Sequence, residues 1–405
     1  MNHHLSHFQG SLNGIITLSS SKSESNRVLI MNALSGNILE LSNLSDARDT
    51  QTMNRLLCEN NSIWDVLDAG TTMRFCTAYL AVKGSGQIIT GSERMKERPI
   101  KLLVDALRSL GANIVYLEEE GFPPLEINAI QGKPITQHIE IPGNVSSQYI
   151  SALLMIGPTL PKGIEIALIG EIFSQPYIEM TLKLMAHFGV KSSWDDQTIK
   201  IQKQPYKVQS YTIESDWSGA SYWYSMVALS KNGQITLKGL RAQSFQGDQQ
   251  IATIMAKMGV KTKYLSDEVQ LDNIAVQDDE QFIDFKKCPD LAQTVMVVAA
   301  VKGITLIMTG LESLKIKETD RIMAMKNELV KLGATLIEEA NSWKLLPGLL
   351  PEVISSIHTY EDHRMAMAFA PICMQRDVQI QDIEVVKKSY PGFWDHLNSV
   401  GIQFK

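Results

Sequence analysis

The chain of 405 residues lacks several features that would assign it to a particular protein class. Its cysteines, Cys58, Cys76, Cys288 and Cys373, are scattered without a CxxC pair, which argues against a disulfide framework and against a zinc site. No uninterrupted apolar run is long enough to span a bilayer, and the opening "MNHHLSHFQG" has no apolar core of a signal peptide. We therefore expect a cytoplasmic protein.

Other absences narrow the possible ligands. Acidic residues (44) outnumber lysine and arginine (38), the formal net charge is −6, and no basic block stands out, so we expect no nucleic-acid partner. There is no Walker loop, GxGxxG motif, serine-hydrolase elbow or metal-ligand spacing. The sequence thus predicts neither a cofactor nor a metal. His3, His4 and His7 could bind a metal on a helix, but we expect a disordered terminal tail there.

What the chain does contain is a repeated unit in which a helix ends at glycine and a strand follows. The glycines are Gly111, Gly189, Gly259, Gly333 and Gly401, and "DTQTMNRLLCENNSIW" is a further copy with Asn60 or Asn61 in place of glycine. Glycine after the last helical turn can adopt the left-handed conformation that closes a helix. Although this punctuation is common in α/β proteins, its even spacing favours a true repeat, with two domains of three units each.

Polar residues collect at one recurring place, the turn before a helix. Examples are "SKSESNR" before "VLIMNAL", "DAGTTMR" before "FCTAYLAV" and "EDHR" before "MAMAFAPI". Helix starts present free N–H groups and the positive end of the helix dipole, so they suit anions. Each turn taken alone is better explained as an ordinary helix cap.

Cations at these turns favour the anion interpretation, because a helix start disfavours positive charge and a cap does not need it. They are Lys22, Arg27, Arg74, Arg94, Lys96, Arg98, Lys317, Arg321 and Arg364. Together with the hydroxyl residues they predict a small substrate that carries phosphate and carboxylate groups.

The candidates for acid–base chemistry are Lys22, Asp290, Glu318 and His363. Asp290 could equally cap its helix, and His363 could be a structural histidine at a helix start. Glu318 and Asp320 could be solvated or paired with Arg321. The residue pattern alone leaves these alternatives open.

Ten motifs, in this order, resemble the 5-enolpyruvylshikimate-3-phosphate synthases (3-phosphoshikimate 1-carboxyvinyltransferases). They are "SKSESNR", "DAGTTMR", "RMKERPI", "VSSQ", "SQPYIEMTL", "DWSGASY", "PDLAQT", "KETDR", "EDHRMAMAF" and "KKSYPGFW", and they cover nearly the whole chain. The resemblance implies an α/β (α+β) fold of two similar domains. Each would contain three βαβαββ units in an inside-out barrel, with the active site in the cleft between the domains. It places one domain at residues 1–19 and 214–405 and the other at 20–213.

The resemblance also implies an activity of the shikimate pathway, which leads to chorismate and the aromatic amino acids. The enolpyruvyl group of phosphoenolpyruvate would pass to the 5-hydroxyl of shikimate 3-phosphate, through a tetrahedral intermediate that loses phosphate. It further suggests a monomer that needs no metal and no cofactor.

Carried over by motif, the residues form three sets. Those for shikimate 3-phosphate are Ser23, Arg27, Ser146, Ser147, Ser174, Tyr177, Asp290 and Lys317. Those for phosphoenolpyruvate are Lys22, Gly70, Arg98, Gln148, Arg321, Arg364 and Lys388. In the catalytic set, Asp290 would be the base near the 5-hydroxyl, Glu318 and Lys22 would handle protons at the enol carbon, and His363 would be a secondary polarising partner.

Five positions depart from the family pattern: Asp68, Phe75, Gln175, Ser313 and Lys315. A carboxylate at Asp68 would repel bound anions unless it is paired. These departures bear on affinity and on sensitivity to glyphosate, the inhibitor of this family, rather than on the reaction.

Three other functions fit the sequence less well. A UDP-N-acetylglucosamine enolpyruvyl transferase would carry asparagine after Lys22, where this chain has Ser23, and a reactive cysteine in a mobile loop. An RNA 3'-terminal phosphate cyclase would need a nucleotide site and a basic RNA track. A catalytically inactive binding protein would not need Lys22, Asp290 and Glu318 together.

Overall fold

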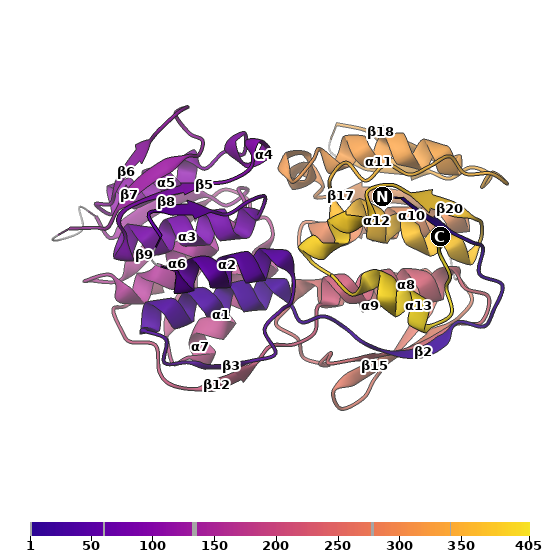
Figure 1. The fold of residues 1–405 in the computed structure, drawn as a ribbon, viewed down its shortest axis with the longest axis horizontal. Coiled ribbons are helices and arrows are strands. Elements are labelled where there is room, and N and C mark those ends of the chain that lie inside the picture. The colour runs from indigo at the N-terminus through magenta and orange to yellow at the C-terminus, as the bar shows by residue number, and fades with distance from the viewer. Residues whose placement is uncertain (1, 60, 132–135, 277–278, 341) are drawn as a thin grey trace. The chain divides into compact units, whose positions relative to one another are not determined.

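The computed structural model describes residues 2–59, 61–131, 136–276, 279–340 and 342–405. The chain divides into two compact units, and we refer to Met1–Ser20 with Glu214–Lys405 as unit 1 and to Ser21–Ile213 as unit 2. Unit 2 is therefore inserted into the chain of unit 1 (Figure 1).

Unit 2 alternates helices and strands. Its helices are α1 (Lys22–Ser35), α2 (Arg48–Cys58), α3 (Gly70–Lys83), α4 (Glu93–Lys96), α5 (Lys101–Ser109), α6 (Ser147–Ile156) and α7 (Gln175–His187). Its strands are β3 (Glu40–Ser42), β4 (Ile63–Asp65), β5 (Ser85–Thr90), β6 (Asn113–Tyr116), β7 (Leu125–Asn128), β8 (His138–Pro142), β9 (Ile164–Ile169), β10 (Ser192–Asp195), β11 (Thr198–Ile201) and β12 (Ser210–Thr212).

Unit 1 has the same character. Its helices are α8 (Trp217–Leu229), α9 (Ile251–Lys257), α10 (Ala292–Lys302), α11 (Arg321–Leu329), α12 (His363–Phe369) and α13 (Phe393–Ser399), with 3-10 turns that include η2 (Gly247–Gln250), η3 (Pro289–Leu291), η4 (Glu312–Ile316) and η7 (Ile383–Lys388). Its strands are β1 (His3–Leu5), β2 (Asn13–Thr17), β13 (Gln234–Lys238), β14 (Val260–Tyr264), β15 (Glu268–Asn273), β16 (Glu280–Asp284), β17 (Thr305–Thr309), β18 (Thr335–Glu338), β19 (Trp343–Leu346) and β20 (Val378–Ile380).

The predicted repeat is visible in the sheets. In the described ranges, four sheets of four strands share one topology, a parallel pair extended by an antiparallel hairpin: β4-β5-β7-β6, β8-β9-β11-β10, β2-β13-β15-β14 and β16-β17-β19-β18. Two shorter pairings, β3 with β12 and β1 with β20, complete the set. Each unit thus contains two full sheets and one reduced one, and the predicted mixed α/β fold is confirmed.

Glycine closes the repeated helices as predicted. Gly111, Gly189, Gly259, Gly333 and Gly401 have φ between 77° and 102°, the left-handed region that side chains with a Cβ rarely adopt. In the further copy, α2 ends at Cys58, the next residue, Glu59, has an extended conformation, and Asn60 lies outside the described residues.

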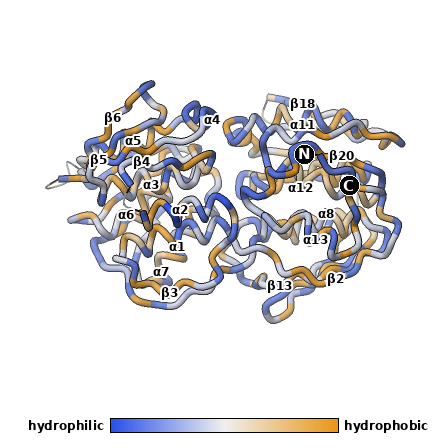
Figure 2. The backbone as a smooth tube through the Cα atoms, in the orientation of Figure 1, coloured by the Kyte–Doolittle hydropathy of each residue, from blue (hydrophilic) through white to orange (hydrophobic). Residues whose placement is uncertain are grey.

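The core of each unit is a group of buried helices. In unit 2, α1, α3 and α6 contact one another, and in unit 1 the same holds for α8, α10 and α12 (Figure 1). Nearly all residues of α6, α8 and α10 are buried, which suits helices that are apolar on all sides. Apolar stretches follow these helices and the neighbouring strands in both units (Figure 2). Their polar first turns are therefore the places where chemistry can sit.

One expectation about the N-terminus is wrong. His3–Leu5 form strand β1, which pairs with β20, and the ring of His3 packs against Trp394 and Phe404. These contacts order the segment that we expected to be a disordered tail.

Candidate active site

The buried helices of unit 2 begin at the predicted hydroxyl residues. Ser21 caps α1 by accepting from the N–H of Glu24 at 3.3 Å, and Ser146 caps α6 by accepting from the N–H of Gln148 at 3.4 Å. The Gln148 side chain then donates to Thr71 Oγ1 at 3.0 Å, which joins the first turn of α6 to that of α3. The start of α6 therefore lies beside the start of α3.

Arg98 lies directly on the first residue of α3. A Cβ added to Gly70 would be 2.6 Å and 2.7 Å from the two terminal nitrogens of the Arg98 guanidinium, so only glycine permits this approach. Arg98 is 8% exposed, and its Nε has no hydrogen-bond partner in the described part of the chain. A buried guanidinium beside the free N–H groups of a helix start is suited to binding an anion.

Arg27 is more tightly held. Its Nε donates to Thr181 Oγ1 at 2.7 Å, and its terminal nitrogens donate to Ser151 Oγ and to the carbonyls of Ser23 and Tyr177. Burial lowers the pKa of Arg27 to about 10, so it remains a cation at neutral pH. All of these hydrogen-bond partners are neutral, although the nearby carboxylate of Glu24 raises the pKa of Arg27.

Lys22 and the serines of unit 2 occupy first turns. Lys22 Nζ forms an ion pair with Asp49 Oδ2 at 3.0 Å, and Asp49 is buried in α2. Ser23 stands next to it in α1, and Ser147 is the buried first residue of α6. Asp49 was not among the predicted residues, since nothing in its spacing distinguishes it from other helix carboxylates.

Ser174 has an unusual backbone. Its φ of 54° and ψ of 31° place a serine in the left-handed region, directly before α7. Such non-glycine positions cost about 1–3 kcal/mol and cluster at functional sites. The carbonyl of Tyr177, one turn later, accepts from Arg27, so the predicted Ser174, Tyr177 and Arg27 lie in one region of unit 2.

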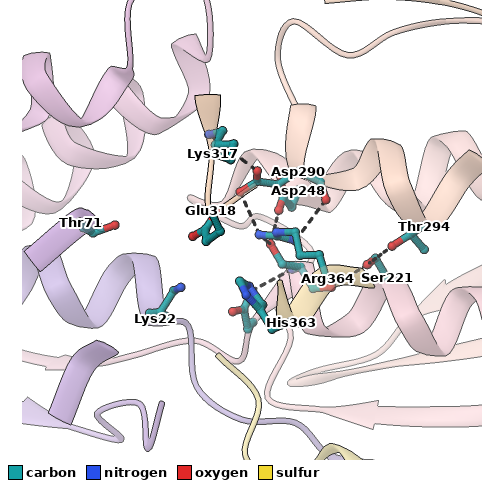
Figure 3. A network of polar contacts seen from close by, with 12 residues as sticks. Lys22, Thr71, Ser221, Asp248, Asp290, Thr294, Lys317, Glu318, His363 and Arg364 are labelled. Carbon is teal, nitrogen blue, oxygen red and sulfur yellow. Dashed lines mark hydrogen bonds and ion pairs between the residues drawn. The ribbon is translucent and has the colours of Figure 1, made fainter. Parts of the chain in front are cut away.

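In unit 1, Asp290 lies at the centre of a charged cluster (Figure 3). Its carboxylate is 2.8 Å from Arg364 Nη2, 3.1 Å from Arg321 Nη1 and 4.0 Å from Lys317 Nζ. Burial raises the pKa of Asp290, but the three cations outweigh it and hold the pKa well below its usual range. Asp290 is thus an ionised member of an ion-pair network in the turn η3, not a helix cap.

Arg321 connects three carboxylates. Its Nε donates to Asp362 at 2.6 Å, Nη1 to Asp290 at 3.1 Å and Nη2 to Glu318 at 2.9 Å. Burial alone would lower the pKa of Arg321. The charges of these carboxylates raise the pKa by more than burial lowers it, so its net shift is upward. Asp320 does not pair with Arg321 but caps α11 through the N–H of Met323.

The "EDHR" motif is held by a strained turn. Tyr360 and Glu361 have φ of 53° and 56°, and Asp362 then caps α12 by accepting from the N–H of Arg364 at 2.9 Å. The His363 ring lies 3.5 Å from Asp362 and is buried. The turn therefore delivers one carboxylate, one imidazole and one guanidinium to the same cluster.

Asp248 also belongs to this cluster, although no sequence pattern indicates it (Figure 3). Ser218, in the first turn of α8, donates its hydroxyl to Asp248 and accepts from Arg364 at 3.4 Å. Burial and the charge of Asp290 raise the pKa of Asp248 to about 6.

Lys388, which was predicted to bind phosphoenolpyruvate, is buried at the end of η7, where it is 1% exposed.

Two of the predicted cations have another role. On the short helix α4, Arg94 pairs with Glu97, and Lys96 pairs with Glu93 and Glu118. These contacts are ordinary surface pairs, so neither arginine nor lysine here indicates an anion site.

The departures from the family pattern have structural partners. Arg48 donates to both carboxylate oxygens of Asp68, Gln175 donates to Glu179, and Lys315 pairs with Glu338. Phe75 is buried, and the guanidinium carbon of Arg27 lies 5.4 Å from the centroid of the Phe75 ring. Ser313 lies in η4.

Two other kinds of feature are absent from the described residues. These residues contain no group of His, Cys, Asp and Glu side chains that could hold a metal ion. No helix among them is both long enough and apolar enough to cross a membrane.

Comparison with known proteins identifies the family. The family model described as EPSP synthase (3-phosphoshikimate 1-carboxyvinyltransferase) matches residues 57–397. The chain belongs to the EPSP synthase family. A 3-phosphoshikimate 1-carboxyvinyltransferase of Bacteroides fragilis is 49% identical over 395 residues, which cover 96% of both chains. The enzyme of the same name from Erwinia tasmaniensis is 35% identical over 95% of this chain and 96% of its own.

Solved structures agree with this assignment at the level of the fold. The EPSP synthase of Acinetobacter baumannii matches with a TM-score of 0.77 over 100% of this chain and 99% of its own, at 18% identity. The resemblance and the fold class predicted from the sequence are therefore both confirmed.

Proposed function

We propose that this chain transfers the enolpyruvyl group of phosphoenolpyruvate to the 5-hydroxyl of shikimate 3-phosphate and releases phosphate. Membership of the EPSP synthase family supports this activity. The observation that carries it in the structure is Arg98, whose buried guanidinium lies on the first residue of α3 with its Nε unpartnered among the described residues.

The residues of unit 2 supply binding. Arg98, Gly70 and Gln148 hold the phosphate and carboxylate of phosphoenolpyruvate, since guanidinium and helix N–H groups match both anions. Arg27, Ser23, Ser146, Ser147, Ser174 and Tyr177 hold shikimate 3-phosphate. The neutral partners of Arg27 support its part, because they orient the guanidinium without neutralising it.

The residues of unit 1 supply charge stabilisation and the base for the 5-hydroxyl. Asp290 accepts a hydrogen bond from the 5-hydroxyl and then its proton. With its three cationic neighbours it is a weak base, and its basicity rises as substrate anions draw Arg364 and Lys317 toward themselves. Arg321, Arg364 and Lys388 stabilise the charge of the phosphoenolpyruvate groups through the reaction.

Proton transfer at the enol carbon falls to Glu318 and Lys22. Glu318 is oriented by Arg321, and Lys22 is oriented by Asp49. His363, which lies against Asp362, polarises the same region.

The chemistry requires no cofactor and no metal, and we propose a cytoplasmic monomer that acts on small molecules and binds no nucleic acid. We also propose that units 1 and 2 are the two enolpyruvyl transferase domains.

The test is phosphate release by the purified chain in metal-free buffer. We expect release only when shikimate 3-phosphate and phosphoenolpyruvate are both present. Turnover with UDP-N-acetylglucosamine in place of shikimate 3-phosphate, or no turnover at all, would overturn the proposal.

Two variants separate binding from chemistry. Arg98→Ala should mainly raise KM for phosphoenolpyruvate, because the main cation of that anion site is removed. Asp290→Ala should mainly lower kcat, because the group that accepts the hydroxyl proton is removed. A wild-type rate in Asp290→Ala would exclude it from the mechanism.

A further inference from the structure

Arg48 and Asp68 form an ion pair at the approach to α3. Arg48 is the first residue of α2, and Asp68 stands two residues before Gly70. Arg48 Nη2 donates to the carboxylate oxygens of Asp68 at 2.9 Å and 2.8 Å. The two side chains are 45% and 36% exposed, and pairs of this kind add little to stability.

The location of this pair matters more than its strength. Two consecutive Cα–Cα steps of 3.8 Å separate Asp68 from Gly70, so the Asp68 carboxylate lies within about 10 Å of the N–H groups that open α3. Arg98 covers Gly70 with a guanidinium that is 8% exposed and whose Nε lacks a partner in the described ranges. An uncompensated carboxylate at this distance opposes the binding of any anion there.

We propose that Arg48 sets the phosphoenolpyruvate affinity of this site by cancelling the charge of Asp68. The inference rests on the proposed function, which places phosphoenolpyruvate at Gly70 and Arg98. Arg48 acts through Asp68 and does not itself touch the substrate. The net charge of the pair is zero in the wild type, and a single substitution of either residue changes it by one unit.

The expected size follows from Coulomb's law. One charge at about 10 Å, with an effective dielectric constant between roughly 40 and 80 for partly exposed groups, changes the affinity for one unit charge about two- to fourfold. Screening reduces the effect, because the Debye length is about 10 Å at 0.1 M salt and about 3 Å at 1 M.

Four proteins form the test: wild type, Arg48→Ala, Asp68→Asn and the double variant. Their pair charges are 0, −1, +1 and 0. At low ionic strength, KM for phosphoenolpyruvate should rise about two- to fourfold in Arg48→Ala, return to the wild-type value in the double variant, and fall in Asp68→Asn. The value of kcat should change less than about twofold, since neither residue meets the reacting atoms.

Arg55→Ala is the matched control. Arg55 lies seven residues, or about 10 Å, further along the same helix, is 43% exposed, pairs with Glu59 and donates to the Asp65 carbonyl at 3.1 Å, so its removal deletes the same charge elsewhere on α2. It should leave KM for phosphoenolpyruvate unchanged. Thermal unfolding of every variant should stay within a few degrees of the wild type, which separates the charge effect from misfolding.

The outcomes distinguish this inference from the proposed function. If the wild type turns over but Arg48→Ala keeps its KM, or the double variant does not recover, the inference fails and the function stands. An equal rise in KM for shikimate 3-phosphate, or a rise that persists in 1 M salt, would also overturn it. If the wild type does not turn over, the function fails, and calorimetric titration with phosphoenolpyruvate alone still decides whether its affinity follows the pair charge.

Discussion

Replacing Arg321 by methionine should strongly destabilise unit 1. The guanidinium is 2% exposed and is the partner of three carboxylates, those of Asp362, Asp290 and Glu318. Methionine fills much of the same volume but supplies neither the charge nor the donors. Asp362, which is 0% exposed, would then be a buried carboxylate without its principal cation.

The magnitude follows from burial. Removing one partner of a buried ion pair costs about 3–5 kcal/mol. Asp290 and Glu318 retain 20% and 17% exposure, so water relieves part of their loss, and we assign the cost mainly to Asp362. For a domain of 150–250 residues each kcal/mol lowers Tm by roughly 2–4 °C, so a fall of about 10 °C is expected. The measurement is calorimetric unfolding without substrates at pH 7, with urea titration as a second estimate.

The pH dependence provides a sharper criterion. Burial raises the pKa of Asp290, but Arg364, Lys317 and Arg321 together hold it below the value of about 3.9 in an unfolded chain. A carboxyl with a lowered folded pKa contributes stability that is present above its unfolded pKa and is lost as pH falls through the folded pKa. The part of the difference between wild type and Arg321→Met that comes from Asp290 should therefore narrow as the pH falls below about 4.

A surface pair of the same unit is the control. Lys315→Met removes a cation whose partner is Glu338, with both side chains more than 40% exposed, and should shift Tm by at most a few degrees. A Tm for Arg321→Met within 2 °C of the wild type, or a difference that does not narrow at low pH, would refute this account of the cluster.

Two further substitutions test the supports of the site. Gly70→Ala should raise KM for phosphoenolpyruvate about tenfold or more with little change in Tm, because the new Cβ would lie 2.6 Å from an Arg98 nitrogen; steady-state kinetics with unchanged KM would contradict it. Glu328→Gln should lower stability by about 2 kcal/mol, because this buried carboxylate accepts from Tyr360 Oη at 2.8 Å and from the His358 N–H at 3.1 Å. Urea unfolding measures that loss, and a midpoint equal to the wild type would exclude it.

Local chemistry allowed much of the fold to be predicted. Glycine at Gly111 or Gly333 closes a helix because it alone enters the left-handed region without strain, so the prediction needed only neighbouring residues. Ser21, Ser146 and Asp362 cap helices for equally local reasons.

Most of the pairing of charges could not be predicted, because it depends on contacts between distant parts of the chain. Arg48 and Asp68 are 20 residues apart, and Arg321 and Asp362 are 41 apart. The sequence shows that cations stand before helices, but not which carboxylates neutralise them. For that reason the sequence pattern includes Lys96 among the cations of an anion site and gives no signal for Asp248.

The insertion of unit 2 into unit 1 has a consequence for the order of folding. Strand β2 ends at Thr17, but its parallel partner β13 begins only at Gln234. At the usual rate of protein synthesis, about 5–20 residues per second, β13 is synthesised roughly 10–40 s after β2. All of unit 2 is made in that interval as one uninterrupted segment. The first strands of the chain are therefore among the last to find their partners, and a nascent-chain experiment should detect compact unit 2 before unit 1.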